Sequence, residues 1–189
     1  MPDDTHTSLV NMLHALTGDN GAVAYMSCPI TTGPRELFLA SDTGFDPFTT
    51  RDVIPEQWKD AVYEPNVYTA NGWAKALRSR HDIPVLNPAA LGVAGWKDNA
   101  SAYGDLWDTV IEEFAAYLII TPGCLLSQGA RREIDTALRN HIPILDVNGM
   151  SVDELAIQNE NNAIHTTYNN LWKASLFTIT LPERQFLLS

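Results

Sequence analysis

Short, continuous apolar runs alternate with amphipathic stretches along most of the chain. Apolar runs bounded by glycine or proline are typical of buried strands, and apolar residues spaced three and four positions apart predict helices. The predicted strands cover residues 22–27, 83–86, 117–121 and 142–145, and the predicted helices cover 8–16, 71–80, 105–116 and 127–139. Helices that alternate with apolar strands predict an α/β fold, with a Rossmann-like parallel sheet sandwiched by helices.

Two segments lie outside this alternation. Prolines at positions 34, 47, 55 and 65 interrupt residues 31–68, which we expect to be irregular. After Met150 we expect a helix to begin at 153–157, the sequence Asn-Glu-Asn-Asn at 159–162 to break it, and a strand to follow at 174–180. We therefore predict one domain over residues 1–189, with a core at 22–147, an irregular insert at 43–68 and a C-terminal extension at 150–189.

The composition limits the class of protein. Hydrophobic residues make up 45% of the 189 residues, which suffices for a packed core and excludes disorder as the main state. The formal net charge is −11, and an acidic chain repels phosphate backbones, so we expect no nucleic-acid partner. The chain has two cysteines, Cys28 and Cys124, which excludes a disulfide scaffold and a cysteine-rich zinc site.

Location and cofactors are also constrained by simple patterns. The N-terminal residues lack the basic start and the small-residue cleavage site of a signal peptide, and the apolar runs are too short to span a bilayer. We therefore expect a cytoplasmic protein with no membrane partner. The five histidines show no metal-ligand spacing, and we expect neither a metal nor a cofactor.

Candidate chemistry gathers at one edge of the predicted sheet. Ligands of open parallel sheets bind at the carboxyl ends of the strands, and the segments that follow Tyr25 and the strand 117–121 leave the sheet there. The helix 105–116 begins at the same edge, so we expect Asp108 and Glu133 to approach one crevice. The helix start at Ser127 offers free amides to a phosphate, and Gly129 lets a ligand approach the backbone closely.

Two carboxylates beside an aromatic hydroxyl suit the cleavage of a glycosidic bond. One carboxylate attacks or stabilises the oxocarbenium-like sugar, and the other handles a proton or orients the leaving group. Each residue also has an ordinary interpretation. A glutamate in the second turn of a helix is most often a solvated surface residue, and an aspartate at a helix start is most often a cap or a dipole partner.

Three blocks of sequence narrow this chemistry. They are AYMSCPITTGPR, NGWAKALRSRHDIPVLNP and DTVIEEFAAYLIITPGCLLSQGARREIDTALRNHIPIL. In order and spacing they resemble the nucleoside 2-deoxyribosyltransferase-like superfamily, over about residues 22–147. That superfamily contains nucleoside deoxyribosyltransferases, 2′-deoxynucleoside 5′-phosphate N-hydrolases and pyrimidine-nucleotide N-glycosidases. The third block is the most specific. It contains, in the order of the family pattern, an aspartate, a helix, an apolar strand and the motif Ser-x-Gly-Ala-x-x-Glu-x-x-x-Ala.

The resemblance implies a role for each matching residue. Glu133 resembles the nucleophile that attacks the anomeric carbon. Asp108 resembles the carboxylate that orients the sugar and shuttles a proton to the base, and Tyr25 resembles the hydroxyl that holds the nucleophile or the substrate. Ser127 matches a serine that contacts the 5′-phosphate in the N-hydrolases, where the deoxyribosyltransferases usually carry an acidic residue. Since a carboxylate repels a phosphate, Ser127 indicates a nucleoside 5′-monophosphate as substrate.

The loop after the first strand departs from the family pattern. The hydrolases have a Gly-Ser-Ile-Arg-like loop, which is replaced here by Cys28-Pro29-Ile30-Thr31. The arginine that helps to hold the phosphate is therefore missing, and Arg35 is the nearest candidate to replace it. By position, Cys28, Ile30 and Thr31 are still expected to line the substrate site.

Alternatives stay open for three further side chains. Asn87 follows a strand, and it either contacts the base or forms a turn before Pro88. Trp96 and Tyr103 precede the helix that carries Asp108, and they either stack on a base or pack in the core or a lid. A neighbouring subunit often completes the pocket in this superfamily, which implies a homodimer or a higher homo-oligomer.

The expected function is hydrolysis of the N-glycosidic bond of a nucleoside 5′-monophosphate by Glu133. Its products are the free base and (deoxy)ribose 5-phosphate. Two alternatives remain: base exchange by a nucleoside 2-deoxyribosyltransferase, and a non-catalytic nucleotide sensor.

Overall fold

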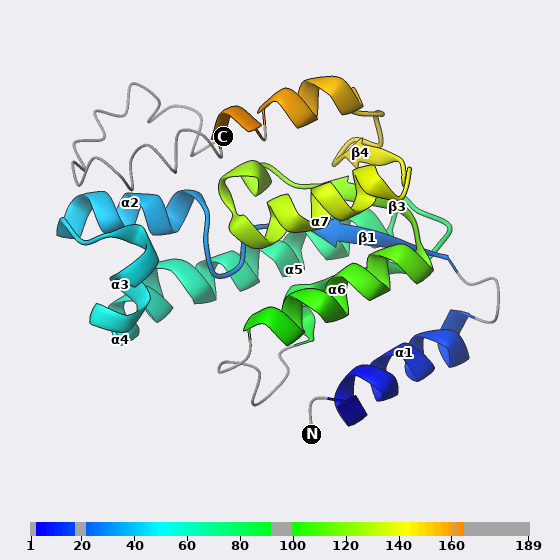
Figure 1. The fold of residues 1–189 in the computed structure, drawn as a ribbon, viewed down its shortest axis with the longest axis horizontal. Coiled ribbons are helices and arrows are strands. Elements are labelled where there is room, and N and C mark those ends of the chain that lie inside the picture. Colours follow the sequence, from blue (N-terminus) through cyan, green and yellow to red (C-terminus); the bar gives the residue numbers. More distant parts are fainter. Residues whose placement is uncertain (1–2, 18–21, 92–99, 161, 165–189) are drawn as a thin grey trace.

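A parallel sheet of four strands forms the centre of the molecule (Figure 1). The computed structural model describes residues 3–17, 22–91, 100–160 and 162–164. The strands are β1 (Val23–Ser27), β2 (Val85–Leu86), β3 (Ala115–Ile120) and β4 (Ile144–Asp146), in the order β2-β1-β3-β4. In the register of the sheet, Tyr25 of β1 pairs with Leu86 of β2 and with Leu118 of β3. The predicted α/β fold is confirmed.

Both faces of the sheet are covered by helices. Val23 and Tyr25 of β1 pack in a core with α6 (Ala100–Phe114) and α7 (Gln128–Arg139), to which Leu13 of α1 (Asp3–Thr17) also belongs. Ala24 and Met26 point to the opposite face and pack against α5 (Glu64–Arg78). Burial on both faces explains why the strands are apolar runs and do not alternate with polar residues.

Residues 34–68, which include the insert, are helical, and the expectation of an irregular segment over 31–68 is wrong. Its elements are α2 (Pro34–Thr43), α3 (Pro47–Val53), α4 (Pro55–Trp58) and the π-helical turn η1 (Lys59–Tyr63), which leads directly into α5. Each of the first three helices begins with proline, and Pro65 is the second residue of α5. A residue in the first helical turn needs no N–H donor, so these prolines start helices and do not interrupt them.

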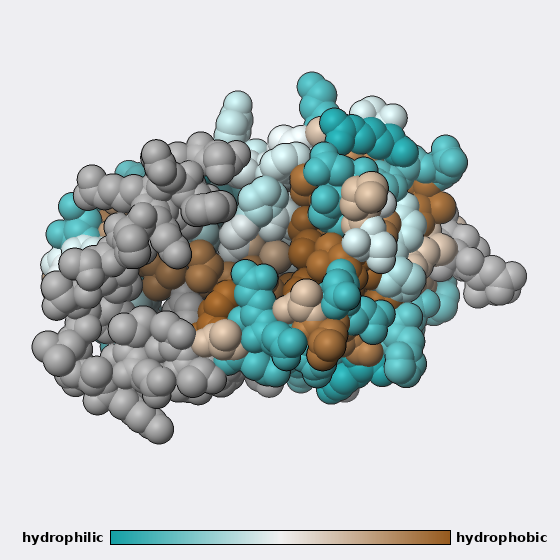
Figure 2. Space-filling model, turned by 90° about the horizontal axis from the view of Figure 1, so that it is seen from above, coloured by the Kyte–Doolittle hydropathy of each residue, from teal (hydrophilic) through white to brown (hydrophobic). Residues whose placement is uncertain are grey.

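The segment after β4 continues as a helix over residues 154–160 and 162–164. Asn159 and Glu160 are therefore helical, where a break was expected. Ile157 is buried in the core beside α6 and α7, whereas Met150 and Leu155 are exposed. Figure 2 shows hydrophobic residues in the middle of the face viewed from above. The predicted strand at 174–180 lies outside the described residues.

The strand order places a topological switch point at the carboxyl ends of β1 and β3, where ligands of open parallel sheets bind. The chain passes from β1 to β2 on one side and from β3 to β4 on the other, so the connections diverge between the two central strands. The insert helices lie beyond the carboxyl end of β1, and α6 begins at that end (Figure 1). Among the described residues, no helix combines the length and apolar character needed to cross a membrane.

Candidate active site

The carboxylate of Glu133 lies against the carboxyl end of β1. The hydroxyl of Tyr25 donates a hydrogen bond of 2.6 Å to Oε1, and the hydroxyl of Ser27 donates one of 2.6 Å to Oε2. Tyr25 and Ser27 are two positions apart on a strand, so both point to the face that α7 covers. Each oxygen of Glu133 therefore has its own hydroxyl donor.

Burial changes the protonation of this cluster. It raises the pKa of Glu133 to about 7, the nearby charge of Asp108 adds to the increase, and the hydrogen bonds from Ser27 and Tyr25 oppose it. Burial together with the charge of Glu133 raises the pKa of Tyr25 well above its ordinary value, so Tyr25 remains a proton donor in a hydrogen bond. Glu133 itself is partly accessible, so its carboxylate can be both desolvated and reachable.

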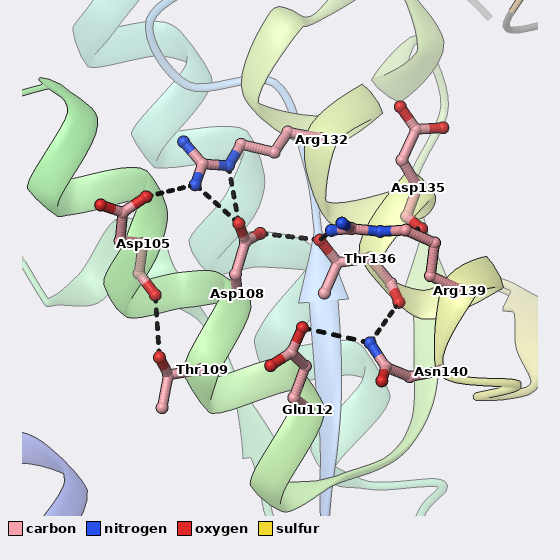
Figure 3. A network of polar contacts seen from close by, with 9 residues as sticks. All are labelled: Asp105, Asp108, Thr109, Glu112, Arg132, Asp135, Thr136, Arg139 and Asn140. Carbon is pink, nitrogen blue, oxygen red and sulfur yellow. Dashed lines mark hydrogen bonds and ion pairs between the residues drawn. The ribbon is translucent and has the colours of Figure 1, made fainter.

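Asp108 is close to Glu133 but is turned towards a cation (Figure 3). Its Oδ2 accepts from Nε of Arg132 at 2.8 Å and lies 2.6 Å from Nη2, and its Oδ1 accepts from the hydroxyl of Thr136 at 2.8 Å. Arg132 also binds Asp105 at 2.6 Å. Both oxygens of Asp108 on α6 therefore have partners on α7. The sequence did not predict these contacts, which differ from those expected of a proton shuttle.

The space for Arg132 depends on a glycine. A Cβ atom at Gly104 would collide with the guanidinium of Arg132, which lies across the first turns of α6. The absence of a side chain at position 104 therefore lets Arg132 reach Asp105 and Asp108 together.

Ser127 is the N-cap of α7, and its hydroxyl is already used there. Its Oγ accepts from the backbone N–H of Ala130 at 3.5 Å and lies 3.0 Å from Oγ1 of Thr32. Oγ1 of Thr32 in turn accepts from the backbone N–H of Gln128 at 3.0 Å. Two hydroxyls from different loops thus meet at the start of α7, as helix capping requires.

Glycines and prolines fit the two loops together at this edge. Gly33 has φ of 120° and Gly123 has φ of 79°, conformations that other residues rarely adopt. A Cβ atom would lie 2.8 Å from Cβ of Pro29 at Gly33, and 2.7 Å from Cγ of Pro34 at Gly123. Gly129 is exposed, and a Cβ atom there would meet none of the described residues within 4 Å, so these residues leave the backbone open to a ligand.

The three loop residues that were predicted to line the substrate site differ in how far they are exposed. Cys28 is buried, and burial and the charge of Glu133 raise the pKa of its thiol, which keeps the thiol protonated. Ile30 is half-buried, and its carbonyl accepts from the side chain of Asn66 of α5 at 3.0 Å. Thr31 is exposed, and the next residue, Thr32, makes the contact to Ser127.

Asn87 forms the turn before Pro88, and both ends of its side-chain amide have partners within the protein. Its Nδ2 donates to Oδ1 of Asn71 at 2.9 Å, and its Oδ1 accepts from the backbone N–H of Ala89 at 3.0 Å. The side chain caps the short 3₁₀-helix η2 (Pro88–Ala90), which fits the alternative of a turn before Pro88, and the substrate-binding role stays a prediction.

The sequence interpretation missed Ser27 and Thr32. Ser27 could have been found from the period of two along β1, since it shares a face with Tyr25. Thr32 gave no such signal, because only the folded loop brings it to the start of α7. Among the described residues, no group of three His, Cys, Asp or Glu side chains could hold a metal ion.

Comparison with known proteins adds no relative to this description. No protein-family model, no curated protein and no solved structure matches the chain.

Proposed function

We propose that the protein hydrolyses the N-glycosidic bond of a nucleoside 5′-monophosphate. One observation carries the proposal: Glu133 holds a desolvated carboxylate between two hydroxyl donors, at the edge of the sheet where ligands of this topology bind. A pKa of about 7 leaves much of this group ionised at neutral pH. Such a carboxylate is suited to attack an electron-poor sugar carbon.

The reaction proceeds in two displacements. In the first, an oxygen of ionised Glu133 bonds to C1′ while the C1′–N bond breaks, and its electron pair leaves with the base, which takes a proton from solvent. In the second, water attacks C1′ while the C1′–O bond to Glu133 breaks, which releases (deoxy)ribose 5-phosphate and leaves the electron pair of that bond on the Glu133 carboxylate; the attacking water loses its proton to solvent. Tyr25 and Ser27 fix the orientation of the nucleophile. Because Arg132 and Thr136 hold Asp108, we assign Asp108 a positioning role in place of the proton shuttle.

The 5′-phosphate lies at the start of α7 in this proposal. The helix dipole favours an anion there, Gly129 leaves the approach open, and the hydroxyls of Ser127 and Thr32 supply short polar contacts. Arg35 is directed elsewhere, because its Nη2 donates to the hydroxyl of Thr69 at 3.4 Å. The site thus binds the phosphate mainly through hydroxyls and backbone amides.

The cellular setting is proposed on the sequence alone. A reduced cytoplasm suits two unpaired, buried cysteines. A homodimer, with a partner residue in the pocket, is proposed only by resemblance to the deoxyribosyltransferase-like superfamily.

The decisive experiment is incubation with a panel of ribo- and deoxyribonucleoside 5′-monophosphates, with the free base quantified by chromatography. Glu133→Ala should abolish base release, while thermal melting shows that the fold persists. Glu154→Gln, at an exposed position after β4, is the matched control and should keep full activity. Failure of the folded protein to release any base from the whole panel would sink the proposal.

Two further readouts separate the alternatives. Acid-quenched protein should carry the mass of a glycosyl ester on Glu133 during turnover. A second free base, added as acceptor, yields a new nucleoside only from a transferase, whereas a hydrolase yields the sugar phosphate. A nucleotide sensor binds the nucleotide with no turnover, and Glu133→Ala then changes binding alone.

A further inference from the structure

A buried asparagine lies on the apolar face of α5. Asn66 is buried together with Ala70, Ala74 and Leu77, which pack on the sheet, and it precedes Ala70 by about one helical turn. A buried polar side chain costs free energy unless it is hydrogen-bonded, whereas an apolar residue would simply continue this face. The hydrogen-bond partner of Asn66 therefore indicates what the position does.

That partner is the loop that follows β1. Nδ2 of Asn66 donates to the backbone carbonyl of Ile30 at 3.0 Å. The helix behind Asn66 is fixed to the sheet, because Ala70 and Met26 of β1 belong to one buried cluster. The insert helices lie beyond the carboxyl end of β1 and lead directly into α5 (Figure 1). Asn66 thus ties the loop to a helix that is anchored in the core.

The same loop is also held by α7. Two residues after Ile30, the hydroxyl oxygen of Thr32 lies 3.0 Å from Oγ of Ser127 and accepts from the backbone N–H of Gln128 at 3.0 Å. Only the exposed Thr31 separates the two anchored residues. Because two residues span at most about 7 Å, a loop that is held at Ile30 has little freedom at Thr32.

The two ends of the loop are fixed as well. The backbone N–H and the hydroxyl of Thr121 each donate to the carbonyl of Ser27 at 3.1 Å, and the carbonyl of Gly33 accepts the first hydrogen bond of α2 at 3.1 Å. Between these ends, Asn66 and Thr32 connect the loop to α5 and α7, which cover opposite faces of the sheet. A movement of the loop at the α5 contact is therefore expected to move Thr32.

We propose that Asn66 is a positioning residue, which holds the loop after β1 so that the hydroxyl of Thr32 stays at the start of α7. The ligand at that place, a nucleoside 5′-monophosphate whose phosphate lies beside Ser127 and Thr32, rests on the proposed function. Asn66 is buried, so it acts through Thr32. The inference also gives the insert at 43–68 a role, because Asn66 belongs to it.

The first test needs no ligand. Asn66→Ala should speed the amide hydrogen exchange of Gln128, followed by NMR, by roughly 3- to 10-fold, the factor that corresponds to one hydrogen bond. Gln128 is the first residue of α7, where amides exchange through local opening, so its rate reports the loop contact and not the stability of the whole fold. Thr32→Val removes the acceptor and should have the same effect, to which Asn66→Ala should add nothing.

The second test is ligand binding, measured calorimetrically in the Glu133→Gln background to prevent turnover. The probes are nucleoside 5′-monophosphates and the corresponding nucleosides. Asn66→Ala should weaken nucleotide binding by roughly 3- to 10-fold and leave nucleoside binding unchanged. In the Thr32→Val variant, Asn66→Ala should cause no further loss, because the two residues act through one contact.

Asn11→Ala is the matched control, since it removes the same side chain from an exposed position of α1. It should change neither the exchange of Gln128 nor any affinity. Equal losses for nucleotide and nucleoside in Asn66→Ala would reveal a general structural role and overturn the proposal. Additive losses in the variant that combines Asn66→Ala with Thr32→Val would overturn it too, as would an unchanged exchange rate of Gln128.

The positioning role and the proposed function fail separately. Base release by the unmodified protein, with the exchange of Gln128 unaffected by Asn66→Ala, removes the positioning role and keeps the hydrolase. Faster exchange of Gln128 in Asn66→Ala, without turnover of any nucleotide by the unmodified protein, keeps the positioning role and removes the hydrolase.

Discussion

The hydroxyl of Ser27 donates a 2.6 Å hydrogen bond to Oε2 of Glu133, which is 106 positions later in the chain. Ser27 is fully buried, as is Tyr25, which binds the other carboxylate oxygen. The two hydroxyls oppose the effect of burial on the pKa of Glu133, and they hold both oxygens in place. The candidate nucleophile is therefore positioned by the strand on which α7 packs, and the predictions below begin with that contact.

Ser27→Ala should raise the pKa of Glu133 above about 7. A hydrogen bond to a charged group contributes about 1.5–3 kcal/mol, which corresponds to an increase of about 1–2 pKa units. Carbon-13 NMR titration of the glutamate carboxyl groups measures the change directly, and the acidic limb of the pH–rate profile should shift equally. Ser41→Ala, at an exposed position of α2, is the control. A titration midpoint that does not move contradicts the prediction.

Glu133→Gln should stabilise the protein while it removes activity. The pKa of Glu133 rises from 4.5 to about 7 on folding, so folding disfavours the ionised form. The stability of the unmodified protein should fall as pH rises from about 4.5 to about 7 and then level off. Above that pH the variant should gain roughly 1–3 kcal/mol, a range reduced because Glu133 is partly accessible. Urea unfolding at pH 5 and pH 8 checks both points, and an equal gain at the two pH values would contradict them.

Gly104→Ala should destabilise the protein, although alanine normally favours a helix. The added Cβ would displace Arg132 and leave Asp105 and Asp108 without their shared cation. We expect a loss of about 1–3 kcal/mol. Gly72→Ala is the matched control, because Gly72 lies within α5 and a Cβ there meets nothing within 4 Å. That substitution should stabilise by about 0.5–1 kcal/mol. If both substitutions changed the free energy of unfolding in the same direction in chemical denaturation, Arg132 would not need the space at position 104.

Glu36→Gln should stabilise the insert helices at neutral pH. Burial raises the pKa of Glu36 to about 8, with the charges of Asp46 and Arg51 and the indole of Trp58 as smaller influences. Since the raised pKa disfavours the ionised form on folding, stability should fall from about pH 4.5 to about pH 8. The variant should remove this slope and gain about 1–3 kcal/mol at pH 8. Thermal melting across this pH range measures it, with Glu56→Gln, an exposed residue of α4, as control.

Ser127→Ala should weaken phosphate binding more than it weakens the fold. Loss of the N-cap should cost about 1 kcal/mol of stability. Under the proposed function, it should also raise KM for nucleoside 5′-monophosphates and leave any residual activity on unphosphorylated nucleosides unchanged. Steady-state kinetics with a nucleotide and its nucleoside separate the two effects, and Ser41→Ala, at an exposed position of α2, is the control. An equal change for both substrates would assign Ser127 to capping alone.

Local patterns were sufficient wherever one periodicity dominated a segment. The apolar residues from Val23 to Met26 predicted a strand buried on both faces, and the spacing of Ala130, Ile134 and Ala137 predicted the inner face of α7. These elements depend on neighbouring residues and on burial, which a sequence displays directly. The alternation of helices and strands also predicted the edge of the sheet where Tyr25 and Glu133 meet.

Proline signals were ambiguous because one residue type can either start or stop a helix. Pro34, Pro47 and Pro55 were interpreted as interruptions, yet each begins a helix, since its missing N–H falls where no hydrogen bond is needed. The small core of Leu39, Trp58 and Val62 supplies the packing that makes such short helices stable. That packing joins residues from different helices, so it could not be read from any one of them.

The sequence by itself determined the α/β fold and the residue types at the edge of the sheet. The tertiary structure alone decided which polar groups pair: Ser27 with Glu133, Thr32 with Ser127, and Arg132 with Asp108. The physical reason is the short range of a hydrogen bond, about 3 Å, which no spacing along a chain can specify between separate elements. Asp108 is an example. The topology predicted its place at the edge of the sheet, but it did not predict that Arg132 binds it.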